Sequence, residues 1–173
     1  MHLIELQTIQ QKMLSMLEEY TGCTVVPSNT TKQMPPYPYI SYTLINLDTR
    51  KGTYSAHTSV KEVDGEEIPV EVLTMPTKLK YSLTVQSESD INAFMIALQM
   101  KDFFEEAKRQ ELADSGAIVA DVSGITPRDN MITIDYEYRK GLDVTLSLNN
   151  VLERADTGEI SNISINNINL EKE

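Results

Sequence analysis

Hydrophobic residues at the amino terminus recur at every third or fourth position. They are Leu3, Leu6, Ile9, Met13, Met16, Leu17 and Tyr20. This spacing places them on one side of an α-helix. Gly22 follows as a typical stop signal, and charged and amide side chains interrupt the apolar ones too often for a signal peptide or a membrane span. The pattern predicts an amphipathic first helix that ends before Gly22.

Two later segments alternate between apolar and polar residues, as half-buried β-strands do. The first begins after a proline-rich loop from Pro27 to Pro38, which favours extended backbone. The apolar positions are Ile40, Tyr42 and Leu44 in the first segment, and Leu79, Tyr81, Leu83 and Val85 in the second. Between the segments, residues 49–76 are mostly polar, with Asp64-Gly65 as a turn signal. They are predicted to form an extended hairpin or a mobile loop outside the compact part of the domain.

A second helix is predicted after the strand that ends near Val85. Ser87, Ser89 and Asp90 offer residues that cap helices. Apolar residues then follow helical spacing at Ile91, Phe94, Met95 and Leu98. The pattern runs on through Leu112, with a bend expected near Met100 and an end near Gly116.

The carboxy-terminal third alternates most regularly. Its apolar positions are Ile132, Ile134, Tyr136 and Tyr138, and then Leu142, Val144, Leu146 and Leu148. We interpret the two runs as an antiparallel hairpin that turns at Arg139-Lys140-Gly141. A last strand is expected over 163–170, with a bulge at Asn166-Asn167. The order of elements predicts one α+β domain over residues 1–173. In it, the first helix and one long central helix pack on one face of a single antiparallel sheet.

Charge and composition limit the classes of function. With 15 Lys and Arg against 26 Asp and Glu, the formal net charge is −11. Such acidity disfavours sequence-specific nucleic-acid binding, which needs clustered basic side chains. A channel through which DNA merely passes is compatible with it, although solubility explains the same charge.

The residues suggest no catalytic, cofactor or metal site. Neither glycine-rich phosphate motif is present. Cys23, His2 and His57 lie far apart in the sequence, which argues against zinc and against a catalytic triad. The acidic residues Glu62, Asp64, Glu66 and Glu67 lack the spacing of a calcium loop and fit a solvated hairpin tip. One alternative is a ligand pocket between sheet and helices, lined by Tyr42, Tyr81, Tyr136 and Tyr138, although tyrosines at such positions are more often core.

Six residues are predicted to contact other proteins. Arg139 and Lys140 would form a basic tip at the predicted turn, a docking point for the acidic surface of a neighbouring copy. Arg50-Lys51 is a second basic pair, at the start of the 49–76 excursion. Tyr37 and Tyr39, at the end of the proline-rich loop, are expected to pack on a neighbour.

Two segments carry a resemblance to a known family. They are Pro36-Tyr37-Pro38-Tyr39-Ile40-Ser41-Tyr42 and Tyr136-Glu137-Tyr138-Arg139-Lys140-Gly141-Leu142-Asp143-Val144-Thr145-Leu146. The first resembles the proline and tyrosine entry into the first strand of the neck and tail-terminator proteins of long-tailed bacteriophages and phage-like particles. The second is similar to that family's hairpin, in which a basic turn precedes an Asp and alternating apolar residues.

The resemblance implies a structural α+β subunit that assembles with other copies as a ring, typically of six. The ring would lie at the head-proximal end of the tail, stop polymerisation of the tail tube protein and offer a surface to the head–tail connector protein, while DNA passes through its channel. Such a protein is made in the host cytoplasm and becomes part of the virion, without a membrane, cofactor or catalytic site. A head-completion or baseplate component of the same particle would share these features.

Overall fold

The computed structural model describes all residues except 1–2, 32, 51–54, 64–65, 133–134 and 156–173. The chain divides into two compact units. The first comprises Met1–Gly52 with Pro76–Asn150, and the second comprises Thr53–Met75 with Val151–Glu173. The assignment of residues 1–173 to one domain therefore stays a prediction, and the two units are described separately.

The first unit begins with the predicted amphipathic helix, α1 (Leu3–Thr21). Met13 and Leu17, one turn apart, are buried. The helix ends at Gly22, whose φ of +67° is a backbone conformation that glycine adopts at little cost. The Gly22 amide donates to the Glu18 carbonyl at 2.8 Å, so the predicted stop signal is confirmed.

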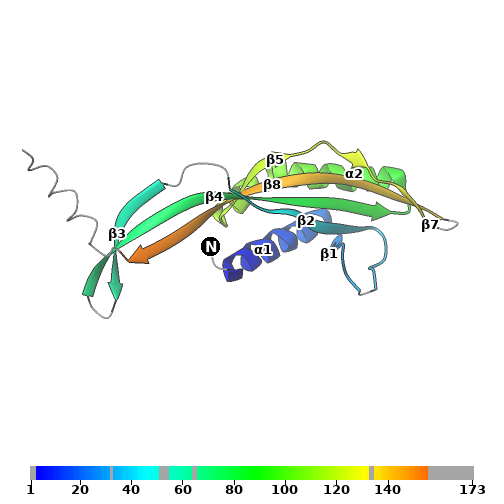
Figure 1. Cartoon of the computed structure of the whole chain (residues 1–173). Helices are drawn as coiled ribbons and strands as arrows, with labels where there is room; N and C mark the ends of the chain where they lie inside the picture. Colours follow the sequence, from blue (N-terminus) through cyan, green and yellow to red (C-terminus); the bar gives the residue numbers. More distant parts are fainter. Residues whose placement is uncertain (1–2, 32, 51–54, 64–65, 133–134, 156–173) are drawn as a thin grey trace, which may run out of the picture. The chain divides into compact units, whose positions relative to one another are not determined.

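The sheet of this unit has the strand order β1-β2-β4-β8-β5 (Figure 1). The bounds of these strands are β1 Thr24–Pro27, β2 Tyr39–Arg50, β4 Glu66–Ser87, β5 Ala117–Val122 and β8 Asp135–Ala155. β2 pairs with β4, and β5 with β8, in antiparallel fashion. The short edge strand β1 runs parallel to β2. The mixed α+β class and the antiparallel centre of the sheet are confirmed.

The predicted hairpin with its turn at Arg139-Lys140-Gly141 is wrong. These residues lie inside one long strand, β8. The short strand β6 (Thr126–Pro127) pairs with Gly141 and Lys140, and β7 (Asn130–Ile132) pairs with the first residues of β8. The apolar positions 138, 142 and 144 are all even-numbered, so the apolar residues before and after Lys140 lie on one face, as one continuous strand requires. The chain reverses direction between β7 and β8 instead.

The central helical segment has three parts. α2 (Asp90–Asp102) is followed by a π-helical turn, η1 (Phe103–Ala107), and by α3 (Arg109–Asp114). The Ser89 side chain caps α2 by accepting a hydrogen bond from the Asn92 amide at 3.5 Å. The segment ends at Gly116, with φ of +91°. The predicted helix and its end are confirmed, and its irregularity lies at 103–107, just beyond the bend predicted near Met100.

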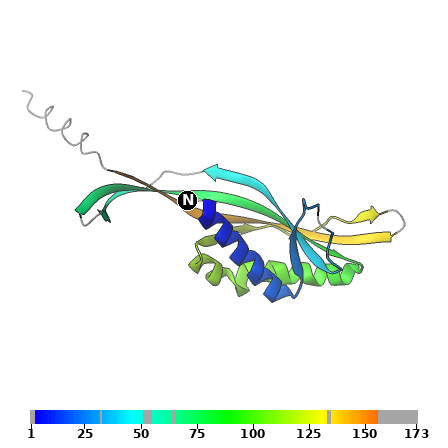
Figure 2. The ribbon, with the colours of Figure 1, turned by 90° about the horizontal axis from the view of Figure 1, so that it is seen from below.

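Both helices pack on the same face of the sheet (Figure 2). One hydrophobic core joins α1, α2 and η1 to the apolar residues of β4 and β8. Its strand residues are Leu79, Tyr81, Leu83 and Val85, and Leu142, Val144, Leu146 and Leu148. Because neighbours along a strand point to opposite sides, the residues between them lie on the face that the helices leave uncovered.

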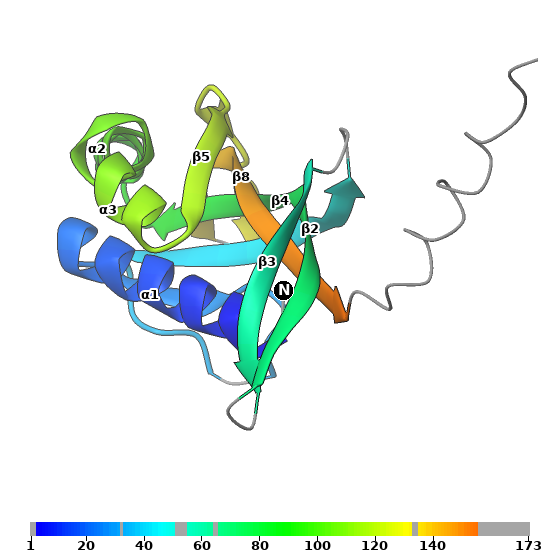
Figure 3. The same cartoon turned by 90° about the vertical axis from the view of Figure 1, so that its left-hand side faces the viewer.

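In the second unit, β3 (Ser55–Val63) pairs with the beginning of β4 (Figure 3). The pairing is antiparallel, from Ser55 opposite Thr74 to Val63 opposite Glu66. This confirms the hairpin predicted within residues 49–76. Its turn at Asp64-Gly65 and the strand predicted over 163–170 lie outside the described residues.

Candidate interaction surfaces

The uncovered face of the sheet in the first unit is polar. On β4 it carries Lys80, Ser82 and Thr84, which alternate with the buried residues. On β8 it carries Gly141, Asp143 and Thr145. An antiparallel sheet with helices on one side commonly presents such a face to water or to a partner.

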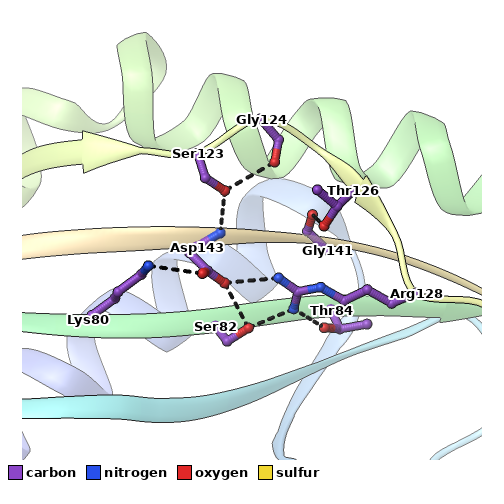
Figure 4. A network of polar contacts seen from close by, with 9 residues as sticks. All are labelled: Lys80, Ser82, Thr84, Ser123, Gly124, Thr126, Arg128, Gly141 and Asp143. Carbon is purple, nitrogen blue, oxygen red and sulfur yellow. Dashed lines mark hydrogen bonds and ion pairs between the residues drawn. The ribbon is translucent and has the colours of Figure 1, made fainter.

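An ionic network crosses this face (Figure 4). Arg128, next to β6, pairs with Asp143 at 2.9 Å between Nη2 and Oδ1. The other guanidinium nitrogen donates to Ser82 Oγ at 2.6 Å and to Thr84 Oγ1 at 2.9 Å. Lys80 contacts the second Asp143 oxygen at 3.1 Å. Charge-assisted contacts of this kind are the stronger hydrogen bonds in proteins, so the network ties the β6 segment to β4 and β8.

The Asp143 carboxylate pairs with both cations of this network, Arg128 and Lys80. Burial alone would raise the pKa of the Asp143 carboxyl, but the hydrogen bonds from Arg128, Ser82 and Lys80 outweigh it and hold that pKa below its ordinary value. Asp143 therefore stays ionised and paired at neutral pH. Such a carboxylate stabilises the fold and does not serve as a general acid.

Gly141 makes room for the Arg128 side chain. A Cβ added at Gly141 would lie 2.6 Å from the guanidinium carbon and nitrogens of Arg128. The absent side chain is what lets the guanidinium lie flat on the sheet. The glycine that suggested a turn in the sequence therefore serves a close approach within a strand.

Three of the six predicted interface residues come together around Glu137. The Tyr37 hydroxyl donates to Glu137 Oε1 at 2.6 Å, and Arg139 forms an ion pair with the same carboxylate. Tyr37 stacks on Tyr39 with ring centroids 5.6 Å apart. Tyr37 is exposed, whereas Tyr39 and Glu137 are buried. The hydrogen bond to Glu137 is the largest cause that raises the pKa of Tyr37 to about 12.

Lys140 lies apart from this cluster, next to the amino-terminal end of α2. Its ammonium contacts Asp90 at 2.6 Å and Asp129 at 3.1 Å, and only 11% of its side chain is exposed. Burial would lower the Lys140 pKa, but the two carboxylates raise it above the ordinary value. The pair Arg139-Lys140 is therefore no exposed basic tip, because each residue is held by carboxylates of its own chain.

The remaining two predicted interface residues have no described side chains. Arg50 is the last residue of β2, and Lys51 lies outside the described residues. The assignment of all six residues to an interface stays a prediction.

Two tyrosines of the alternative pocket, Tyr42 and Tyr81, contact α1 through Gln10. Tyr81 is buried, and its hydroxyl donates to Gln10 Oε1 at 3.4 Å. The Gln10 amide donates to the Tyr42 hydroxyl at 3.3 Å. Tyr138 packs against the core, and the Tyr136 side chain is not among those described. Gln10 of α1 therefore contacts the hydroxyl groups of both Tyr42 and Tyr81.

A shallow cleft of about 220 Å³ lies between β5 and the η1–α3 segment. It is lined by Glu105, Arg109 and residues 119–122. Arg109 donates to the Val119 carbonyl across it at 3.3 Å. The cleft is small beside ordinary ligand pockets, which measure several hundred Å³.

The sequence pattern did not identify an exposed apolar surface of the first unit. It is the outer face of α2, formed by Ile91, Phe94, Met95 and Leu98, whose exposed fractions are 76%, 45%, 55% and 41%. The buried residues Ala93, Ile96, Ala97 and Met100 lie on the opposite side of the helix. Apolar residues on both sides of α2 are the signal that was present in the sequence, since a surface helix usually has a polar outer face.

The described part of the chain contains neither a cluster of metal ligands nor a membrane-spanning helix. No three His, Cys, Asp or Glu side chains there are grouped closely enough to hold a metal ion. No helix there is long and apolar enough to cross a membrane.

Comparison with known proteins identifies the family. No curated protein matches the chain. A family model described as phage neck terminator protein matches residues 6–173, nearly the whole length. The chain therefore belongs to the phage neck terminator protein family, whose members are structural proteins of the virion neck.

Proposed function

We propose that this chain caps the head-proximal end of the phage tail tube as a ring of six copies, by analogy with the family it resembles. The ring ends tube polymerisation and provides the surface on which the head is joined. The observation that carries the proposal is the family match over residues 6–173. The family places the chain in the neck, among other components of tail and head.

The exposed surface of the first unit supports an assembly role. Monomeric proteins rarely expose large contiguous apolar patches, and such patches commonly mark sites of protein association. The outer face of α2 presents four large apolar side chains at helical spacing. A subunit that acts by binding its neighbours needs a surface of this kind.

The proposal requires no catalytic residue. Arg128 and Lys80 pair with Asp143, and Arg139 pairs with Glu137, while Lys140 is held by Asp90 and Asp129. These contacts fix strands and helix ends to one another. An enzyme would instead need a reactive group beside a base in an open pocket.

The partners follow from the position in the particle. They are further copies of the chain, the tail tube protein and the head–tail connector protein. DNA would pass through the ring without sequence-specific contacts, which suits a net charge of −11. The protein would be made in the host cytoplasm and then join the virion.

Electron microscopy of particles made without this gene tests the proposal. We expect abnormally long tails, or tails separated from DNA-filled heads, and a return to joined particles when the gene is supplied in trans. Joined particles with tails of normal length would contradict the proposal. Tails of normal length that lack a baseplate, or heads that lose their DNA, would favour a baseplate or head-completion component instead.

A further inference from the structure

The outer face of α2 has charged residues only at its ends. Ile91, Phe94, Met95 and Leu98 form an unbroken apolar stripe. Glu88 precedes it and Asp102 follows it, and both are exposed. Asp102 accepts a hydrogen bond from the Tyr20 hydroxyl at 2.8 Å. Lys101, whose side chain is 35% exposed, lies at the same end and pairs with Glu105. The stripe is thus an apolar surface bordered mainly by acidic residues.

A complementary surface lies on the other side of the first unit. Ile45 sits at an irregularity of β2, where the pairing with β4 shifts between Leu44 and Asn46, and it is 53% exposed. Asn46 is opposite Lys80, and Thr49 is opposite Lys78. Lys78 is exposed, and 45% of the Lys80 side chain is exposed. Ile45 therefore lies beside Lys80, which also contacts Asp143, and Lys78 lies two residues before Lys80 on β4.

We propose that the outer face of α2 packs against the Ile45–Lys78–Lys80 surface of a second copy of this chain. The contact would place apolar side chains against Ile45 and the acidic border of α2 near the two lysines. Complementary charge of this kind fixes the orientation of partners and disfavours contacts between like surfaces.

The positions of the two surfaces favour a head-to-tail contact. α2 belongs to the helical layer, and its outer face points away from the sheet. Lys80 belongs to the sheet face that no helix of this unit covers. A contact between two different surfaces leaves one of each free, so further copies can add until a ring closes. The inference rests on the proposed function, because it names the contact from which the proposed ring is built.

Site-directed cross-linking in particles tests the contact. The natural gene is replaced by one encoding Ile45→Cys and Met95→Cys in a Cys23→Ala background. Cys23 is the chain's only cysteine and is buried, so the two new thiols are the only ones in the variant. Purified particles are treated with a short bis-maleimide, and the products are separated under denaturing conditions.

We expect a ladder of dimers and larger multimers from the double variant, with position 45 joined to position 95 in the linked peptides. The single variants, Ile45→Cys and Met95→Cys, should each stay monomeric. Dimers from Met95→Cys alone would show that α2 contacts α2 and would overturn the head-to-tail contact. Links only to another virion protein, or no links in particles that contain the chain, would overturn it as well.

Deletion of the gene separates failure of this inference from failure of the proposed function. If deletion disturbs tail length or head joining, but the double variant gives no ladder, the terminator role stands and the contact is wrong. If deletion leaves normal joined particles, both fail. Circular dichroism of each purified variant shows that the substitutions leave the chain folded.

Discussion

Both sides of α2 are apolar, and they differ in the size of their side chains, whereas a surface helix usually has a polar outer side. The inner side carries Ala93 and Ala97 beside Ile96 and Met100, and all four are buried. The outer side carries Ile91, Phe94, Met95 and Leu98, all exposed. Small residues on the inner side let the helix lie close to the sheet. The larger side chains on the outer side contribute little to folding, which leaves them available for the contact proposed above.

The largest expected difference in the free energy of unfolding is between alanine substitutions of two phenylalanines. Phe103 is fully buried and lies edge-on to Phe104, whereas Phe94 is 45% exposed on the outer face of α2. We expect Phe103→Ala to lower the free energy of unfolding by about 3–5 kcal/mol, because it removes core packing and leaves a cavity. Phe94→Ala should change it by only about 0.5 kcal/mol. Denaturant titration of both variants measures the difference, and equal losses would contradict the assignment of the two sides.

The polar residues of the uncovered sheet face should contribute more to stability than the apolar stripe of α2. Asp143→Asn should lower the free energy of unfolding by about 1–3 kcal/mol at neutral pH, since it weakens the charge-assisted contacts of Arg128 and Lys80.

The pH dependence of this loss follows from the direction of the pKa shift. The pKa of Asp143 is lower in the folded chain than its ordinary value. Its contribution is therefore present above the unfolded pKa of about 3.9 and disappears as the pH falls through the lower folded pKa. Urea titrations of the wild type and Asp143→Asn should converge in acid. A difference that stays constant from neutral pH to below pH ~3 would contradict the role of the ionised carboxylate.

Gly141→Ala tests the close approach of the Arg128 guanidinium to Gly141. Its effect on stability should be smaller than that of Asp143→Asn. The new methyl group would displace the guanidinium, and we expect a loss of about 1 kcal/mol, comparable to one ordinary hydrogen bond. The loss should be absent when Gly141→Ala is added to Arg128→Met, because the displaced group is already gone. Additive losses in this double-mutant cycle would mean that Gly141 is needed for another reason.

The smallest expected effect is on the ionisation of the Tyr37 phenol, which absorbance measures. Its pKa of about 12 is raised mainly by the hydrogen bond to Glu137, so its phenol should ionise later than an exposed tyrosine. A raised pKa favours the folded state below pH ~10, and this contribution is lost as the pH rises towards the folded pKa. The difference in phenolate absorbance between the wild type and Tyr37→Phe reports this ionisation. Glu137→Gln should lower the midpoint, and an unchanged midpoint would contradict the assigned cause.

The sequence predicts those elements whose signals are local. Gly22 and Gly116 end the two helices where expected, and the alternation in β4 places its buried residues correctly. The error at 139–141 arose because basic residues and a glycine suggested a turn, although the apolar residues on both sides of them stay at even-numbered positions. The Arg128–Asp143 pair joins residues whose proximity depends on the pairing of β6 with β8, and neither residue alone indicates it.

The exposed apolar face of α2 is harder to predict than the fold. In α2, apolar residues occupy both sides, so hydrophobic spacing identifies a helix without indicating which side faces the sheet. Only the packed structure distinguishes the buried alanines from the exposed stripe. The six residues predicted from basic pairs and tyrosines are a different set, and four of them are placed with described side chains: Tyr37, Tyr39, Arg139 and Lys140.

The most direct test is the fraction of joined heads and tails, with tail lengths, in electron micrographs of particles made with Phe94→Glu. The matched control is Ile118→Glu, which places the same charge at another apolar residue, 49% exposed on β5. We predict that Phe94→Glu gives a folded protein but particles with separated or overlong tails, while Ile118→Glu gives normal particles. Normal joined particles with Phe94→Glu would contradict an essential role for the outer face of α2 in building the neck.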